Sequence, residues 1–331
     1  MAEIALNTTM SVTEDKIAAV KRGGAGDARF KLLTFAAAAL IVLLFGGMMA
    51  ALADGAWVSI KTFGWSFLTS QAWNPVTENF GALASIYGTL ITSVLAMGLA
   101  VPVGIGIAIF LTEICPLPLR RPIGIAIELL AGIPSIVYGI WGLFSFAPFF
   151  QEYVQPWIVD AVVNIPILQT LFEGPPYGIG IFTASFILSI MVLPFISAVT
   201  RDVFDTVPSQ LKESAYAMGC TTWEVVWCVV LPFSRAGVVG GAMLALGRAL
   251  GETMAVTFVI GNSHRIHGSL FAPGTTISAT VANEFTEAVG DLYKSSLIEA
   301  GLILFFISFV VLACAQIMLR ILHKRAGGVS A

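Results

Sequence analysis

The sequence predicts an all-α integral membrane protein with six transmembrane helices, and three observations lead to this fold class. First, 57% of the 331 residues are hydrophobic and only 11% are charged, whereas soluble domains carry about 25% charged residues. Second, the mean hydropathy of +0.89 is too high for a chain that must cover its surface with polar groups in water. Third, stretches of about 20 apolar residues, the length that crosses a bilayer, recur along the chain.

The predicted spans are stretches that are free, or nearly free, of Asp, Glu, Lys and Arg: 32–53, 79–112, 122–150, 174–200, 233–261 and 300–319. Glu128 interrupts the third stretch, and Arg248 and Glu252 lie inside the fifth. Ten-residue segments of alternating polarity, the pattern of a membrane β-barrel, do not occur. The spans are therefore expected to be helices.

The distribution of Lys and Arg predicts that both termini are cytoplasmic. With the N-terminus inside, only Lys61, Arg265 and Lys294 fall in outside loops, as the positive-inside rule requires. We expect a cytoplasmic tail over 1–31, a membrane domain over 32–322 and a second cytoplasmic tail over 323–331. The first tail lacks an apolar core with a small-residue cleavage site, so it is interpreted as retained and not as a signal peptide.

Composition and missing motifs exclude several function classes. The net charge of −3 argues against a nucleic-acid partner. No Gly-Lys step occurs, so the chain has no P-loop, and any ATP and Mg must be used by a partner. Protease and hydrolase motifs are absent too, which favours a transport subunit over an enzyme. Four cysteines without a C-x-x-C pair and three scattered histidines predict neither a disulfide framework nor a metal site.

The predicted cytoplasmic loop 201–232 has the pattern of two short helices. Pro208 is placed to start the first helix, because its missing N–H lies among the free donors of a first turn. Gly219 is a natural stop. Between them, apolar residues recur at helical spacing and predict one apolar stripe: Leu211, Ala215 and Met218.

The same loop resembles the EAA loop of importer-type ABC permeases, which have the MetI-like fold. The matching positions keep every spacing of that pattern: Glu213, Ser214, Ala215, Gly219, Val229, Leu231 and Pro232. Ser214 stands for the first Ala of the motif, and Val229 for Ile. The resemblance implies that the short helix docks on a partner ATPase and carries its motion to the membrane. An amphipathic helix lying on lipid is the alternative.

Arg248 and Glu252 are the unusual charges of the fifth predicted span. Arg248 is thirteen residues from Arg235 and fourteen from Asn262, which predicts a position near the bilayer midplane. A charge there is costly and must face protein or water. Glu252 is one helical turn further on and can pair with Arg248. The pair is either a structural ion pair between helices or part of an anion path, because a guanidinium matches an oxyanion.

Two stretches are similar to the phosphate-specific (Pst) ABC importer permeases: 130–144, which ends in Trp-Gly-Leu-Phe, and 247–256, which contains Arg248 and Glu252. The resemblance covers about residues 30–322. It implies six helices around a phosphate path in the bacterial inner membrane, with Arg248 and Glu252 in phosphate translocation. It also implies three kinds of partner: a second permease (PstA), two copies of an ATPase (PstB) and an external phosphate-binding protein (PstS).

Three other readings remain open at this stage: a permease for another oxyanion such as phosphonate or molybdate, an ATP-independent secondary carrier, and an integral membrane enzyme. Among the other charges, Glu128 is expected near the inner interface, paired with a basic group. Glu113 is interpreted as an ordinary loop charge. His264 and His267 have no third ligand nearby, so a metal site there has little support.

Overall fold

The computed structural model describes residues 2–327, with side chains over 26–321 except 167. The chain forms two units, Met1–Asp54 and Gly55–Ala331. The first unit is made by helix α1 (Ala2–Gly55). Its segment Gly26–Gly55 has a mean hydropathy of 2.4 and is long enough to span a membrane, so the first predicted span is confirmed as a helix.

Four more long helices lie in the second unit, and each contains a membrane-length apolar segment. They overlap the second, fourth, fifth and sixth predicted spans: α4 (Leu83–Ile109), α10 (Ile181–Asp205), α13 (Leu231–Leu250) and α16 (Asp291–Gly327). The described residues thus contain five spans, or six if one bent pair of helices counts as a single span.

The bent pair corrects the expectation for the third predicted span, which is not one straight helix. Helix α5 (Leu117–Ala131) stops before α6 (Ser135–Trp141), and the direction changes by 86° at the break. Pro134 lies in the break, and a proline has no N–H to continue a helix ladder. The hydroxyl of Tyr138 donates to the carbonyl of Leu130 at 2.9 Å and so links the two sides of the bend.

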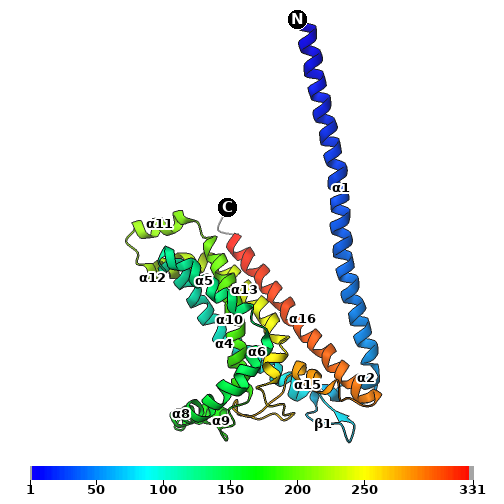
Figure 1. The fold of residues 1–331 in the computed structure, drawn as a ribbon, viewed down its shortest axis with the longest axis vertical. Coiled ribbons are helices and arrows are strands. Elements are labelled where there is room, and N and C mark those ends of the chain that lie inside the picture. The colour runs from blue at the N-terminus through cyan, green and yellow to red at the C-terminus, as the bar shows by residue number, and fades with distance from the viewer. Residues whose placement is uncertain (1, 328–331) are drawn as a thin grey trace. The chain divides into compact units, whose positions relative to one another are not determined.

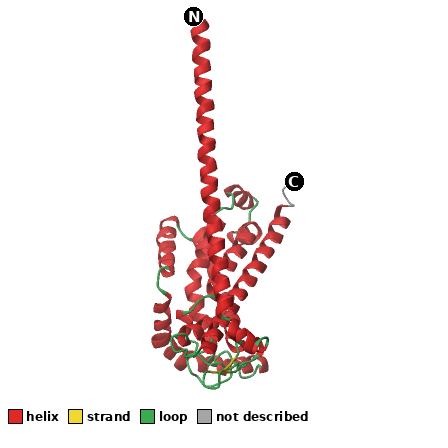
Figure 2. Ribbon diagram, turned by 90° about the vertical axis from the view of Figure 1, so that its right-hand side faces the viewer, coloured by secondary structure: helices red, strands yellow, loops and turns green. Residues whose placement is uncertain are grey.

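Short elements gather at the two ends of the second unit (Figure 1). One end holds α11 (Ser209–Ala217), α12 (Thr222–Val225) and the π-helical turn η4 (Val226–Val230). The opposite end holds most of the loops in Figure 2, with α2 (Trp57–Phe63), α3 (Ser66–Thr69), α8 (Gln155–Val162), α9 (Pro166–Phe172) and α15 (Ile277–Glu284). Here β1 (Trp73–Asn74) pairs antiparallel with β2 (Asn79–Phe80), and Trp73 lies opposite Phe80.

The remaining elements are short helical turns. They are η1 (Phe110–Ile114), η2 (Gly142–Phe146), α7 (Ala147–Phe149), η3 (Phe150–Val154) and α14 (Met254–Thr257). The turn η1 continues α4, and α14 follows α13 after a break.

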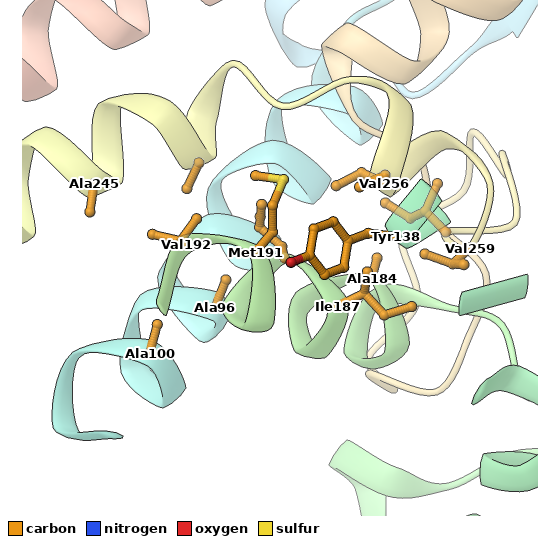
Figure 3. Close-up of a cluster of buried hydrophobic side chains, with 14 of the residues drawn as sticks. Ala96, Ala100, Tyr138, Ala184, Ile187, Met191, Val192, Ala245, Val256 and Val259 are labelled. Atoms are coloured by element: carbon orange, nitrogen blue, oxygen red, sulfur yellow. The ribbon is translucent and has the colours of Figure 1, made fainter. Parts of the chain in front are cut away.

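The core lies where α4, α10 and α13 meet, and small side chains let these helices approach closely. Figure 3 shows Ala96 and Ala100 of α4, Val192 of α10 and Ala245 of α13 in one buried cluster. Close packing of small residues is the usual way in which helices associate in a membrane, where lipid removes the hydrophobic drive.

Two glycines fix the register between α13 and α10. A Cβ added to Gly237 would lie 2.5 Å from a methyl group of Val203, and one added to Gly241 would lie 2.7 Å from Val199. Neither position can accept a side chain unless its neighbour moves. Both glycines therefore allow close packing of the two helices.

Candidate functional site

The predicted loop 201–232 forms the expected pair of short helices. Helix α11 begins directly after Pro208, and Gly219 follows its end with φ of +89°, a left-handed conformation that favours glycine. Thr221 then caps α12: its hydroxyl accepts from the backbone N–H of Glu224, whose carboxylate accepts from the N–H of Thr221 in return. The predicted start and stop residues are thus confirmed.

The EAA-like residues divide into a buried and an exposed set. Ala215 is buried with Phe204 and Val207 in a cluster that also contains residues of α4, α12 and α13, and Leu231 packs against that cluster. Glu213, Ser214, Gly219 and Pro232 are exposed. Ala215 therefore anchors α11 to the membrane helices, while Glu213 and Ser214 remain on the surface.

Only one of the three residues in the apolar stripe predicted for α11 is buried in the structure. Ala215 is buried, but the side chains of Leu211 and Met218 are 44% and 78% exposed. A short helix with one small buried residue has too little apolar surface to bury all three, and the second helix of the loop covers the cluster instead. Contiguous exposed apolar side chains at the tip of a loop are typical of a protein or membrane contact.

Arg248 lies in the last turn of α13, with an exposed side chain. The antiparallel register given by Gly237 with Val203 and Gly241 with Val199, carried forward along both helices, brings Arg248 level with Val192. Val192 lies next to the midpoint of α10. Arg248 therefore lies at the depth of the middle of the helix bundle, and it forms no ion pair with any residue that the structure describes.

The continuous helix expected over 233–261 is wrong, because α13 ends at Leu250. Glu252 lies in the break before α14, and its backbone carbonyl accepts a hydrogen bond from the hydroxyl of Ser278 at 2.7 Å. Its carboxylate accepts from the backbone N–H of Ala255 at 3.3 Å. The side chain of Glu252 is thus directed to the start of α14. Among the described side chains, Glu252 does not form the expected ion pair with Arg248.

The break between α13 and α14 indicates that this part of the chain is surrounded by protein or water. Backbone groups freed inside a membrane need internal partners, and irregular backbone is tolerated there only where it is buried in protein or lines an aqueous path. The hydroxyl of Ser278 supplies one such partner. Discontinuous helices near the bilayer midplane commonly form the binding sites of transporters.

A network of buried hydroxyl groups supports the segment that carries Ser278, and the sequence analysis did not single it out. The hydroxyl of Thr89 in α4 accepts from the backbone N–H of Ile277 at 3.0 Å. The hydroxyls of Ser85 and Thr280 share a hydrogen bond of 3.1 Å. Ser and Thr at positions 85, 89, 92 and 93 of an apolar span were the available signal, because their spacing marks one polar stripe on the helix.

Glu284 forms a second polar cluster at the loop-rich end of the unit. Its carboxylate accepts from the indole of Trp73 and from the hydroxyl of Tyr293, and it contacts His264 at 2.9 Å. The ring of His264 is stacked on Trp73. Burial raises the pKa of the Glu284 carboxyl, but these hydrogen bonds outweigh burial and hold its pKa below the usual range. The cluster joins β1, the 258–276 loop, α15 and α16.

The structure gives His264 this structural role, and its partner is Glu284 and not His267. Within the described residues, no group of three or more His, Cys, Asp or Glu side chains is arranged to hold a metal ion. The predicted pairing of Glu128 with a basic group is confirmed, because Arg201 of α10 lies 2.6 Å from its carboxylate.

Comparisons with known proteins agree on one class. The family model described as "Binding-protein-dependent transport system inner membrane component" matches residues 100–328. The phosphate transport system permease protein PstC of Mesorhizobium japonicum is 65% identical over 317 residues, which cover 96% of this chain and 97% of that protein. PstC of Pasteurella multocida is 56% identical over 298 residues, 90% of this chain and 93% of that protein.

Solved structures of ABC transporters have the same fold. A chain of a bacterial alginate ABC transporter, in complex with its alginate-bound periplasmic protein, has a TM-score of 0.59 at 18% identity and covers 88% of this chain and 95% of its own length. A chain of the inward-facing MetNI methionine ABC transporter has a TM-score of 0.52 at 16% identity, with coverages of 72% and 94%. At such low identity, the likeness concerns the fold alone.

Proposed function

This chain belongs to the family of binding-protein-dependent transport system inner membrane components, and we propose that it is the permease subunit of an ATP-driven phosphate importer. It forms one half of the translocation path, spans the inner membrane several times and works in a complex with other subunits. It is a transport subunit and not an enzyme.

The observation that carries the proposal is the broken helix at Arg248. An exposed guanidinium at the depth of the bundle midpoint is costly unless it faces water or protein. Its forked donors match a tetrahedral oxyanion, and the relatives with high identity are phosphate permeases by name. Arg248 contacts the passing phosphate, and Glu252 holds the break open beside it.

We infer the partners from the resemblance to the Pst importer permeases. A second permease (PstA) completes the pore, two ATPases (PstB) bind ATP with Mg, and an external binding protein (PstS) delivers phosphate. The exposed residues Leu211 and Glu213 of α11, with Met218 directly after it, form the surface that meets the ATPase. ATP binding closes the ATPases, α11 carries the closure to the membrane helices, and the pore opens outward. Hydrolysis returns it inward. Both termini are on the ATPase side.

The test is uptake of labelled phosphate into proteoliposomes that hold the complete complex, with each partner omitted in turn. Arg248→Gln should abolish uptake while the subunits still co-purify. Arg235→Gln, an exposed arginine thirteen residues earlier on α13, is the matched control and should keep most of the uptake. Failure of the Arg248→Gln complex to assemble would instead assign that residue to helix packing.

The same vesicles separate the competing functions. Uptake by this chain alone and without ATP would identify a secondary carrier. Inhibition of phosphate uptake by molybdate or a phosphonate, each added at tenfold excess, would identify a broader oxyanion permease.

A further inference from the structure

One ion pair joins the helix α11 to the membrane helix α4. Lys212 of α11 lies with its Nζ 2.6 Å from the carboxylate of Glu113, in the turn η1 that extends α4. The side chain of Glu113 is 6% exposed and that of Lys212 is 19% exposed. The interpretation of Glu113 as an ordinary loop charge is therefore wrong.

The burial of this pair distinguishes it from the other ion pairs at the same end of the unit. Arg120 with Asp205 and Arg201 with Glu128 have side chains that are 22–48% exposed, and pairs of this kind contribute little. Removing one partner of a pair with a buried carboxylate leaves an uncompensated charge and is far more disruptive. A buried charge pair also prefers one geometry, so it can transmit displacement where apolar contacts alone can slide.

At its other end, α4 holds the segment that supports Glu252. Thr89 and Ser85 of α4 bind Ile277 and Thr280 through their hydroxyls. Between these two residues, the hydroxyl of Ser278 binds the carbonyl of Glu252. The helix α4 is thus in polar contact with α11 at one end and with the support of the broken helix at the other.

We propose that Lys212 and Glu113 are positioning residues that couple α11 to α4, and that α4 carries the displacement of α11 to the break at Glu252. This inference rests on the proposed function, in which α11 is the ATPase contact. Ordinary coupling free energies between sites correspond to factors of about 5 to 150. Loss of the ion pair should therefore lower the phosphate transported per ATP hydrolysed by about fivefold or more.

The experiment measures uptake and hydrolysis together in proteoliposomes that contain the complete complex. Glu113→Gln and Lys212→Gln should each lower the transport-to-hydrolysis ratio, whereas subunit co-purification is retained. The double variant should be no worse than either single one, because both remove the same interaction. Lys212→Arg should keep most of the ratio. Arg120→Gln, which removes a nearby exposed pair, is the matched control and should leave the ratio unchanged.

Three outcomes would overturn the proposal. They are an unchanged ratio in Glu113→Gln, additive losses in the double variant, and failure of Glu113→Gln to bind the ATPase, which would make the pair part of the docking surface. Absence of ATP-dependent phosphate uptake in the unsubstituted complex is a different result, since it refutes the proposed function itself.

Discussion

Replacement of Gly88 by alanine tests whether α4 supports the broken helix. A Cβ at Gly88 would lie 1.8 Å from the carbonyl oxygen of Thr275, and ordinary contact begins at 3.4 Å. The backbone of α4 and of the Thr275 segment must therefore separate by about 1.6 Å. Such overpacking costs about 1–3 kcal/mol, and the gain in helix propensity from Gly to Ala offsets only about 0.5–1 kcal/mol of it.

The same separation should reduce transport. Ser278 lies three residues after Thr275 and donates to the carbonyl of Glu252, and a buried acceptor left without a donor costs about 1–3 kcal/mol. We expect Gly88→Ala to lower both the thermal midpoint of the detergent-purified complex and the rate of phosphate uptake. Tryptophan fluorescence during heating and labelled uptake measure the two effects.

Gly98→Ala is the matched control, because it changes the same helix at a position where an added Cβ meets nothing within 4 Å. It should leave the thermal midpoint unchanged or raise it slightly. If Gly88→Ala is as stable and as active as Gly98→Ala, then the close contact between α4 and Thr275 does not hold, and the support for Glu252 must come from elsewhere.

Three further predictions concern other parts of the chain. Ala215→Leu should overpack the cluster under α11, which costs about 1–3 kcal/mol, and should weaken co-purification of the ATPase. Ala217→Leu, on the exposed face, should do neither. Equal ATPase binding by both variants would refute the idea that Ala215 anchors α11. Glu128→Gln should cost about 1 kcal/mol or less, because its pair with Arg201 is partly exposed, and a much larger fall in thermal midpoint would contradict that view. Glu284 has a lowered pKa, so its contribution to stability is present above its unfolded pKa and is lost as the pH falls through its folded pKa. The difference in thermal midpoint between the unsubstituted complex and Glu284→Gln should therefore shrink on acidification below about pH 4, with Glu287→Gln as the control, and a difference independent of pH would refute this role.

The spans could be predicted from the sequence because each depends on local composition. A run of about 20 apolar residues can cross lipid only as a helix, apart from a closed barrel. The charged residues between the runs indicate where each helix leaves the membrane. The two short helices of the loop 201–232 could be predicted for a similar reason: Pro208, Gly219 and the spacing from Glu213 to Pro232 are local signals. The predicted start and stop of α11 therefore agree with the structure.

The interruptions of the helices could not be predicted in the same way. Gly251 alone does not end a helix, and the residues around it are mostly good helix formers. The carbonyl of Glu252, in the break, accepts a hydrogen bond from Ser278, which lies 26 residues further along the chain. The bend at Pro134 had a local signal, the proline itself, but the sequence does not give the angle of 86°. Likewise, Lys212 and Glu113 are 99 residues apart, and only the fold shows that the pair is buried.

The helix break, which could not be predicted from the sequence, is also the place where the proposed function requires the structure to move. In a continuous helix, Arg248 and Glu252 would lie one turn apart and could pair, which would leave fewer guanidinium donors for an anion. The break separates the two groups: Glu252 accepts from Ala255, and Arg248 stays available. Ser278 binds the carbonyl of Glu252 from a segment that α4 supports, so under the proposed function a movement of α4 would reach the break that follows Arg248.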